Sequence, residues 1–440
     1  MRRNPNLTLC LLAATALLGS PAGARPDAAP TPPPQPLLDS RCPTAAVVDP
    51  AFRDLALDTL AGLVVHAPGR SADGAIRAHH SPGHVDAQGR AWHQISAYQV
   101  NLGLMGALRV APQQQLPVAA GWLRWLARHI APGGANRGVA LDHWVRAGDH
   151  EESTCPPGMA RQQCEAVDAH DSTAATTLLL ADAYLQRGGD AMLIREPGMR
   201  AVLEAAATTL QALTATDGMT LAKPSHPVVY TMDVVEVIAG WRAWGRVQRD
   251  AYAQPQSALN SFGLAERAEQ GLRQRLWLAS AGAWRVHLEG GAPQRQRWYP
   301  DTVAQAWPLL WGVQAGPPGR AADAWRQAIA PWQRGALTGA KPAPGAPTHW
   351  ARQTADPDGF LWPAVAVAAL CTGDDAAARA WVARARQQWL DPKFPFAWPF
   401  QVGDLLWLFW LSDPVAAVAA PRASAPAPTS LADFLDFPGA

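Results

Sequence analysis

Two kinds of hydrophobic pattern alternate along this chain between about residue 50 and residue 412. In segments such as 116–130 and 375–390, apolar residues follow one face and arginines lie opposite, which is typical of helices at a surface. In segment 167–190 the apolar and small residues from Ala174 to Tyr184 cover nearly every face. That second pattern predicts a helix that other helices enclose on all sides.

The alternation predicts about twelve helices. The surface kind is expected at 51–66, 116–130, 197–214, 262–277, 319–332 and 375–390. The enclosed kind is expected at 95–110, 171–187, 231–247, 299–312, 360–371 and 398–411. Pro308 should end or kink the fourth of these. Two concentric rings of six fit this order, so we expect an all-α (α/α)6 toroid with short strand-like loops at its rim. A general helical bundle is the alternative.

Loops that carry acidic and aromatic residues introduce the enclosed helices. In a barrel of helical hairpins every inner helix points the same way, so these loops should gather at one rim. The residues expected around that cleft are Asp168, His170, Asp171, Asp233, Glu236, Asp301 and either Asp356 or Asp358. Carboxylates gathered beside apolar helices repel one another and lose water, and such crowding is typical of functional sites. Asp171 is expected to be the N-cap of its helix.

The composition of the chain limits the kinds of molecule that the protein is expected to bind. The chain has 37 basic and 36 acidic residues, a net charge of +1 and no long basic cluster, so nucleic acid is not expected to bind. Twenty tryptophans stand out. Most should fill gaps between helices, but a flat aromatic ring also matches the C–H face of a sugar. The aromatic residues expected to bind substrate are Tyr230, Trp298, Tyr299, Trp362 and Trp398.

The two ends of the chain differ in composition from the helical region between them. Residues 1–24 have a basic start, an apolar stretch and a small-residue cleavage site, which predicts a signal peptide and a periplasmic or secreted protein. A Pro-rich arm at 25–47, the toroid at 48–412 and an Ala/Pro-rich tail at 413–440 should follow. No later apolar run is long enough to span a membrane.

Four cysteines remain after signal cleavage, an even number in an oxidising compartment. Cys155 and Cys164 bracket a short loop and form the first expected disulfide, and Cys42 with Cys371 is the remaining possibility. The spacing does not suit a zinc site built from cysteine pairs. We expect neither a metal ion nor a cofactor.

The segment DAHDSTAATTLLLADAY, from Asp168 to Tyr184, resembles the acidic start of an inner helix in glycoside hydrolase family 8. The whole architecture resembles the six-hairpin glycosidase-like toroids, which also include the unsaturated glucuronyl hydrolases. This resemblance implies the toroid fold and a carbohydrate substrate. Family 8 places its proton donor at the start of the first inner helix, where residues 93–103 of this chain contain no Asp or Glu.

Glycoside hydrolysis needs one protonated carboxyl group and one ionised carboxylate. Asp233 and Glu236 share a helix face, because they lie three residues apart. We expect Glu236 to serve as the acid and Asp171 as the base, with Asp233 as the third catalytic candidate. Asp168, His170 and Asp301 are expected to bind the substrate. Capping and helix-dipole roles are the structural alternative for these acidic residues.

Two other functions remain open. A polysaccharide lyase would use histidine and tyrosine side chains to remove a proton, for which His143, His170, Tyr98 and Tyr230 are candidates. A non-catalytic toroid that binds polysaccharide or helps assemble it would need only the aromatic cleft. The absence of an acidic residue at the family 8 proton-donor position favours this non-catalytic toroid over an enzyme.

Overall fold

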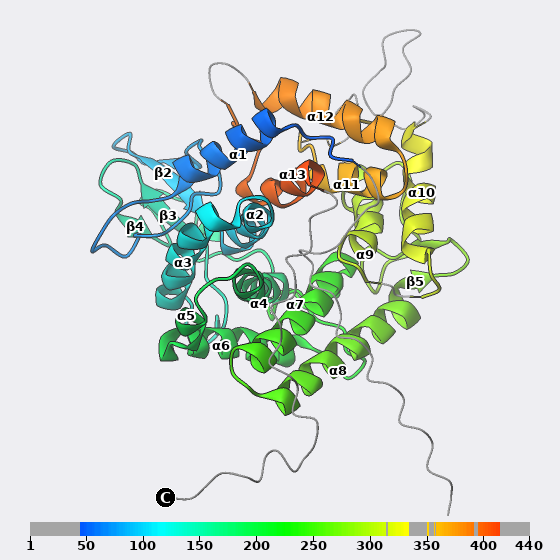
Figure 1. Cartoon of the computed structure of the whole chain (residues 1–440), viewed down its shortest axis with the longest axis horizontal. Helices are drawn as coiled ribbons and strands as arrows, with labels where there is room; N and C mark the ends of the chain where they lie inside the picture. Colours follow the sequence, from blue (N-terminus) through cyan, green and yellow to red (C-terminus); the bar gives the residue numbers. More distant parts are fainter. Residues whose placement is uncertain are drawn as a thin grey trace, which may run out of the picture. The chain divides into compact units, whose positions relative to one another are not determined.

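Six inner helices form a closed ring, and six outer helices surround it (Figure 1). In this computed structural model each inner helix contacts the next, and the last contacts the first. The inner helices are α2 (Ala97–Val110), α4 (His170–Gln186), α7 (Thr231–Asp250), α9 (Trp307–Leu310), α11 (Pro363–Cys371) and α13 (Leu405–Ser412). The outer helices are α1 (Pro50–Leu63), α3 (Pro112–His129), α6 (Pro197–Leu213), α8 (Pro255–Gly271), α10 (Arg320–Gln333) and α12 (Asp375–Trp389). The predicted all-α toroid is confirmed.

The structure describes residues 45–313, 316–333, 350–351, 356, 358–390 and 395–413, all within one contact unit. The predicted signal peptide, most of the Pro-rich arm, the tail beyond Asp413 and Cys42 lie outside these residues. The pairing predicted for Cys42 with Cys371 is therefore not described.

Burial explains the two hydrophobic patterns. In α4 every residue from His170 to Tyr184 is buried, whereas α12 buries one face, exposes Arg379 and leaves its other two arginines partly exposed. The inner helices also approach closely: a Cβ atom on Gly240 of α7 would lie 2.8 Å from Cβ of Ala175 in α4. A buried ion pair links the same two helices, with Arg246 Nη2 2.7 Å from Asp182 Oδ2.

Two local expectations were wrong. Asp171 is not an N-cap, because α4 begins at His170 after Ala169. The backbone N–H groups of His170 and Asp171 both donate to the carbonyl oxygen of Ala222, so no side-chain cap is needed there. The predicted helix at 299–312 is broken into a π-turn (η4, Trp298–Thr302), a 3₁₀ turn (η5, Val303–Ala306) and α9. Pro308 lies in the first turn of α9, where proline is tolerated, and not at a kink.

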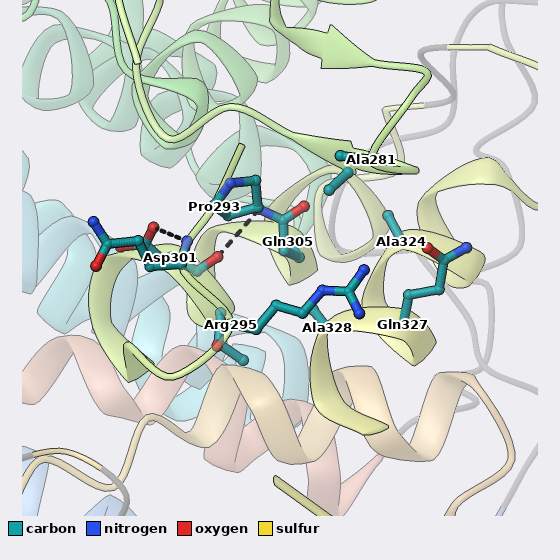
Figure 2. Close-up of a pocket in the computed structure, with 11 residues that line it drawn as sticks. Ala281, Pro293, Arg295, Asp301, Gln305, Ala324, Gln327 and Ala328 are labelled. Atoms are coloured by element: carbon teal, nitrogen blue, oxygen red, sulfur yellow. Dashed lines mark hydrogen bonds between the residues drawn. The ribbon is translucent and has the colours of Figure 1, made fainter. Parts of the chain in front are cut away.

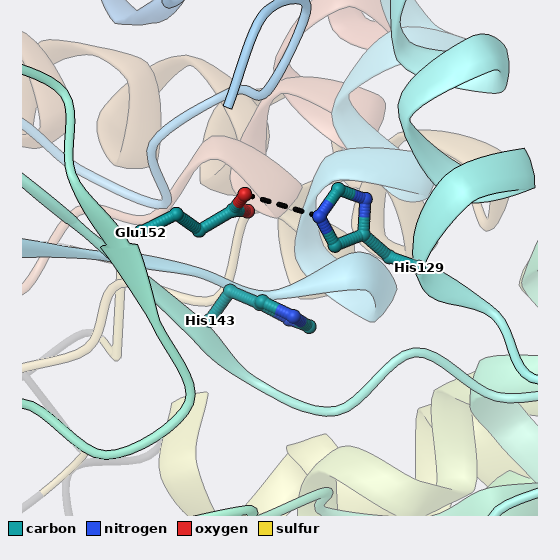
Figure 3. Close-up of side chains that lie close together, drawn as sticks. All are labelled: His129, His143 and Glu152. Atoms are coloured by element: carbon teal, nitrogen blue, oxygen red, sulfur yellow. Dashed lines mark hydrogen bonds and ion pairs between the residues drawn. The ribbon is translucent and has the colours of Figure 1, made fainter. Parts of the chain in front are cut away.

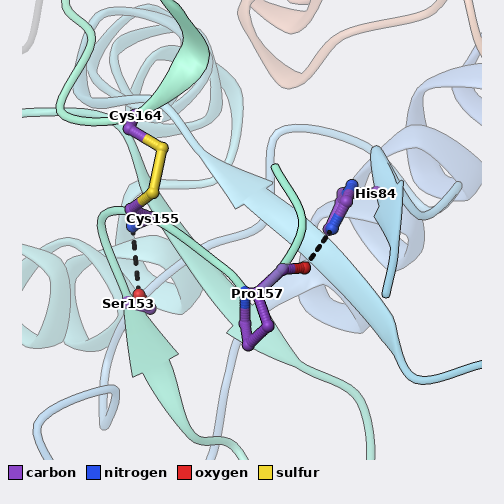
Figure 4. The surroundings of a disulfide bond; sticks show 5 residues. All are labelled: His84, Ser153, Cys155, Pro157 and Cys164. Carbon is purple, nitrogen blue, oxygen red and sulfur yellow. Dashed lines mark hydrogen bonds between the residues drawn. A yellow bond between two sulfur atoms is a disulfide. The ribbon is translucent and has the colours of Figure 1, made fainter. Parts of the chain in front are cut away.

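Short β-strands lie at the rim of the toroid. Strands β1 (His84–Val85), β2 (Ala91–Ile95), β3 (His143–Arg146) and β4 (Glu152–Ser153) form an antiparallel sheet in sequence order. The predicted Cys155–Cys164 disulfide is confirmed and closes the loop that follows β4 (Figure 4). A second hairpin pairs β5 (Trp277–Leu278) with β6 (Ala283–Trp284). The remaining elements are α5 (Ala191–Arg195), η2 (Arg161–Gln163), η3 (Leu272–Leu276) and η6 (Val402–Asp404).

Among the helices described, none combines the length and apolar character that a membrane span requires.

Candidate active site

A pocket of about 200 Å³ lies over the N-terminal ends of three inner helices, α2, α4 and α13. Its lining residues come from β2, the start of α2, the segments before and within the first turn of α4, and the segment before α13. They are Gln94, Ser96, Ala97, Tyr98, Gln99, Ala140, Asp142, Val167, Asp168, Thr173, Trp398 and Gln401. Segments far apart in the sequence therefore meet at one rim of the toroid.

Asp171 lies beneath this rim and is completely buried. Its Oδ2 accepts a hydrogen bond of 2.9 Å from the hydroxyl of Thr220, and its Oδ1 accepts one of 2.8 Å from the backbone N–H of Ser172. Burial raises the pKa of Asp171 to about 8, although both hydrogen bonds favour the ionised form. At neutral pH this carboxyl group is therefore mainly protonated.

Glu236 on α7 is buried as well, with 2% of its surface exposed. Its Oε1 accepts two hydrogen bonds, one of 2.8 Å from the hydroxyl of Tyr98 and one of 3.0 Å from Nε1 of Trp307. Burial raises the pKa of Glu236, while the two donors act in the opposite direction. This carboxyl group joins α2, α7 and α9 at the base of the rim.

Asp233 lies one turn before Glu236 on α7 and is only half-buried. Burial of its carboxyl group raises its pKa well above the usual value, and the charges of Asp171 and Glu236 raise it further. Three crowded carboxyl groups cannot all ionise, so the cluster holds protons at neutral pH. Of the three residues, Asp233 alone is partly exposed.

Asp168 is exposed at the mouth of the pocket. Its negative charge contributes to the raised pKa values of Asp233, Glu236 and Tyr98, so it lies within electrostatic reach of the whole cluster. Asp142 lines the same pocket and accepts a hydrogen bond of 3.0 Å from Gln94 Nε2. Burial raises the pKa of Asp142 to about 6.

Aromatic side chains flank the carboxyl groups. The ring of Tyr299, which is 46% exposed, stacks on Trp362 with 4.6 Å between centroids. Trp362 adopts a left-handed backbone conformation (φ 51°), and its Nε1 donates to Asp356 Oδ2 at 2.8 Å. Such a conformation is strained for a bulky residue and persists where the surroundings enforce it. Trp398 is 54% exposed and lines the pocket itself.

Three of the predicted substrate-binding residues, Trp298, His170 and Asp301, lie inside the protein. Trp298 is 4% exposed and packs in the core against Trp332 and Trp350. The imidazole of His170 is also buried, with Nε2 3.3 Å from Asn136 Oδ1. Tyr230, in contrast, is partly exposed, and its hydroxyl lies 2.9 Å from Nε2 of His226.

Asp301 lies apart from the carboxyl cluster. Its Oδ1 accepts a hydrogen bond of 2.7 Å from the backbone N–H of Gln294, and its Oδ2 lies 3.7 Å from Arg297 Nε. It lines a separate pocket of about 20 Å³ against α10 (Figure 2). That volume holds one or two water molecules and not a sugar.

Sequence reasoning did not connect Tyr98, Trp307 or Thr220 with the carboxyl groups. Tyr98 lies in the first turn of α2 and so obeys the same rule that identified the acidic residues: the starts of inner helices face the rim. Trp307 opens the inner helix α9 and obeys the same rule, whereas Thr220 does not. Away from this cluster, one group in the described residues, His129, His143 and Glu152, brings together side chains that could hold a metal ion.

The sequence matches no protein-family model, and no curated protein matches it. Solved structures do share its fold. A wild-type glycosidase matches with a TM-score of 0.52 and 14% identity, over 84% of this chain and 99% of that chain. A glycosidase variant in complex with glucose matches with a TM-score of 0.53 and 13% identity over the same shares. The expected six-hairpin glycosidase-like fold is confirmed, and glycoside hydrolase family 8 is not specifically confirmed. At these identities the likeness shows the fold alone.

Proposed function

We propose that this chain is a glycoside hydrolase that cleaves an oligo- or polysaccharide, with Asp233 as its general acid. The observation that carries the proposal is the state of Asp233: this partly exposed residue at the start of α7 has a carboxyl group whose pKa is raised well above its usual value by burial and by the neighbouring Asp171 and Glu236. A glycosidase requires such a group, protonated at neutral pH yet within reach of substrate.

The exposed carboxylate of Asp168 is the proposed partner of Asp233. As the C–O bond breaks, Asp233 gives its proton to the leaving glycosidic oxygen. Asp168 then either accepts a proton from the water that attacks the anomeric carbon or attacks that carbon itself, and the separation of the two carboxyl groups decides between these routes. Water supplies the hydroxyl group and proton that complete the two products.

Glu236 and Asp171 take different roles from those that the sequence suggested. Both are buried, so in this proposal neither contacts the substrate. Two donors on Oε1 of Glu236 act against the larger effect of burial on its pKa, and the interaction with Glu236 raises the pKa of Asp233. These residues are proposed to position Asp233 and to adjust its acidity.

The exposed aromatic rings support a carbohydrate substrate. The Tyr299–Trp362 stack and Trp398 present flat faces beside the carboxyl groups, and such faces pack against the C–H face of a pyranose. The similar fold of glycosidases, one of them with glucose bound, agrees with this substrate class. The disulfide and the predicted signal peptide agree with a periplasmic or secreted enzyme.

The test uses a panel of neutral and uronate-containing polysaccharides. We expect wild type to release reducing ends from at least one of them, and Asp233→Asn to slow release by about 10²- to 10⁴-fold, because the substitution removes general acid catalysis. Asp217→Asn is the matched control: Asp217 pairs with Arg275 outside the cluster, so this variant should keep wild-type activity. Undiminished release by Asp233→Asn would exclude the assigned role.

One observation favours a lyase as the second candidate. The hydroxyl of Tyr230 lies 2.9 Å from His226 Nε2, and its ring contacts His287, at the start of the same helix that carries Asp233. A tyrosine–histidine pair of this kind suits proton removal beside a uronate. Ultraviolet absorbance of an unsaturated product, absent in hydrolysis, distinguishes the two reactions. Binding by affinity electrophoresis without any release would instead indicate a non-catalytic toroid.

A further inference from the structure

Two histidines and a glutamate meet on the side of the rim sheet that faces α3. His129 is the last residue of α3, His143 opens β3 and Glu152 opens β4. One ligand atom from each lies within 4.8 Å of the others. Figure 3 shows the three side chains arriving from separate elements at one shared space. All three are largely shielded from solvent.

Hydrogen bonds set the tautomer of both imidazole rings. His129 Nδ1 lies 2.8 Å from the carbonyl oxygen of Trp125, and His143 Nδ1 lies 2.8 Å from the carbonyl oxygen of Leu141. A carbonyl oxygen only accepts hydrogen bonds, so each Nδ1 carries the proton. In the neutral ring Nε2 then bears the free lone pair. This is the tautomer in which histidine binds a metal ion.

Hydrogen bonds also orient the carboxylate of Glu152. Its Oε1 accepts a hydrogen bond of 3.0 Å from Trp125 Nε1, and its Oε2 lies 3.0 Å from His129 Nε2. The indole of Trp125 also stacks on His129, with 4.1 Å between centroids. Each ligand candidate is therefore oriented by a partner outside the group, as is usual around protein-bound zinc. The site adjoins the C-terminal end of α3, where the helix dipole favours a cation.

We propose that His129, His143 and Glu152 bind one zinc ion through Nε2 of both histidines and a carboxylate oxygen of Glu152. Two imidazoles and a carboxylate are a ligand set that zinc accepts, with water completing four-coordination. Sequence spacing gave no sign of this site, because the ligands come from three elements and include no cysteine.

Bound zinc has a clear structural consequence. It ties the end of α3 to β3 and β4. Asp142, which lines the rim pocket, directly precedes His143, and successive residues of an extended strand point to opposite faces. Zinc bound to His143 therefore holds one face of this segment in place, and the opposite face, which carries Asp142, contributes to the pocket.

The test measures metal content and affinity on the full chain, produced without a polyhistidine tag. Protein is stripped with a chelator, incubated with zinc, desalted and analysed by elemental mass spectrometry. We expect about one zinc ion per chain and a rise in melting temperature on zinc addition. Substitution with Co²⁺ should give the visible absorption bands of a tetrahedral site.

Matched variants separate binding from folding. His143→Gln and Glu152→Gln should each weaken zinc binding at least about tenfold in a chelator competition, and Trp125→Phe should weaken it by a similar factor through Glu152. His93→Gln changes another buried histidine, on the neighbouring strand β2, and should keep full zinc content. Circular dichroism identifies any variant that fails to fold.

The alternative is a metal-free ion pair between protonated His129 and Glu152. In that case zinc would leave the melting temperature unchanged, and the desalted protein would contain almost none. Either of these results overturns the proposal, and so does unaltered zinc affinity in folded His143→Gln and Glu152→Gln.

Discussion

Asp171→Asn gives the sharpest test of the buried carboxyl cluster, because this substitution mimics the protonated side chain. The Asn side chain has the same shape, its Oδ1 can accept from the backbone N–H of Ser172, and the hydroxyl of Thr220 can turn to accept from Nδ2. The variant therefore keeps the local hydrogen bonds but cannot ionise.

The magnitude follows from the two pKa values of Asp171. Its pKa is about 8 in the folded protein, against 3.8 for an ordinary aspartate. Between these values the folded state binds more protons than the unfolded state, so the free energy of unfolding falls as pH rises, by about 1.4 kcal/mol per pH unit. The stabilising contribution is complete below about pH 4 and is lost as pH rises through 8.

Urea denaturation, followed by tryptophan fluorescence, should be measured from pH 5 to pH 7. Across this range we expect wild type to lose about 2 to 3 kcal/mol of unfolding free energy relative to Asp171→Asn. Asp217→Asn, which alters a partly exposed aspartate outside the cluster, should follow the wild-type slope. Parallel slopes for wild type and Asp171→Asn would refute the account of this carboxyl group.

Three further substitutions test separate parts of the structure. Tyr98→Phe removes a donor to the buried carboxyl group of Glu236 and should lower the free energy of unfolding by about 1 to 3 kcal/mol in urea denaturation. Because Glu236 is proposed to position Asp233, the same variant should lower kcat/KM about 10- to 100-fold. Trp398→Ala should raise KM for oligosaccharides about 2- to 10-fold and leave kcat unchanged, as measured by initial rates. Arg246→Met removes the ion-pair partner of the buried Asp182 between two inner helices and should cost about 3 to 5 kcal/mol in urea denaturation, most of it recovered when Asp182→Leu is added.

The ring architecture was predictable because it depends on local patterns. Whether a helix is apolar all round or on one face can be read from its own residues, as α4 and α12 show. Helix ends were less predictable where a distant group replaces a cap. In α4 the carbonyl oxygen of Ala222 replaces the side-chain cap, and no local sequence pattern predicts this contact.

The carboxyl cluster was only partly predictable. The inner helices are parallel, so the sequence predicted that one end of the inner ring would carry Asp171, Asp233 and Glu236. Their hydrogen bonds did not, because Tyr98 and Glu236 lie 138 residues apart and meet only through the closed ring. The sequence also left open which way a rim side chain points: Trp298 turns into the core and Asp301 toward a separate small pocket, while Tyr299 between them stays exposed.

The most direct test of the proposed function compares two substrates of the same sugar that differ in leaving group. A natural glycan needs proton donation to its leaving oxygen, whereas a dinitrophenyl glycoside departs without it. If Asp233 is the general acid, Asp233→Asn should lose about 10²- to 10⁴-fold in kcat/KM on the glycan and much less on the dinitrophenyl glycoside. Equal losses on both substrates, or no loss on either, would contradict the assignment of Asp233 as the acid.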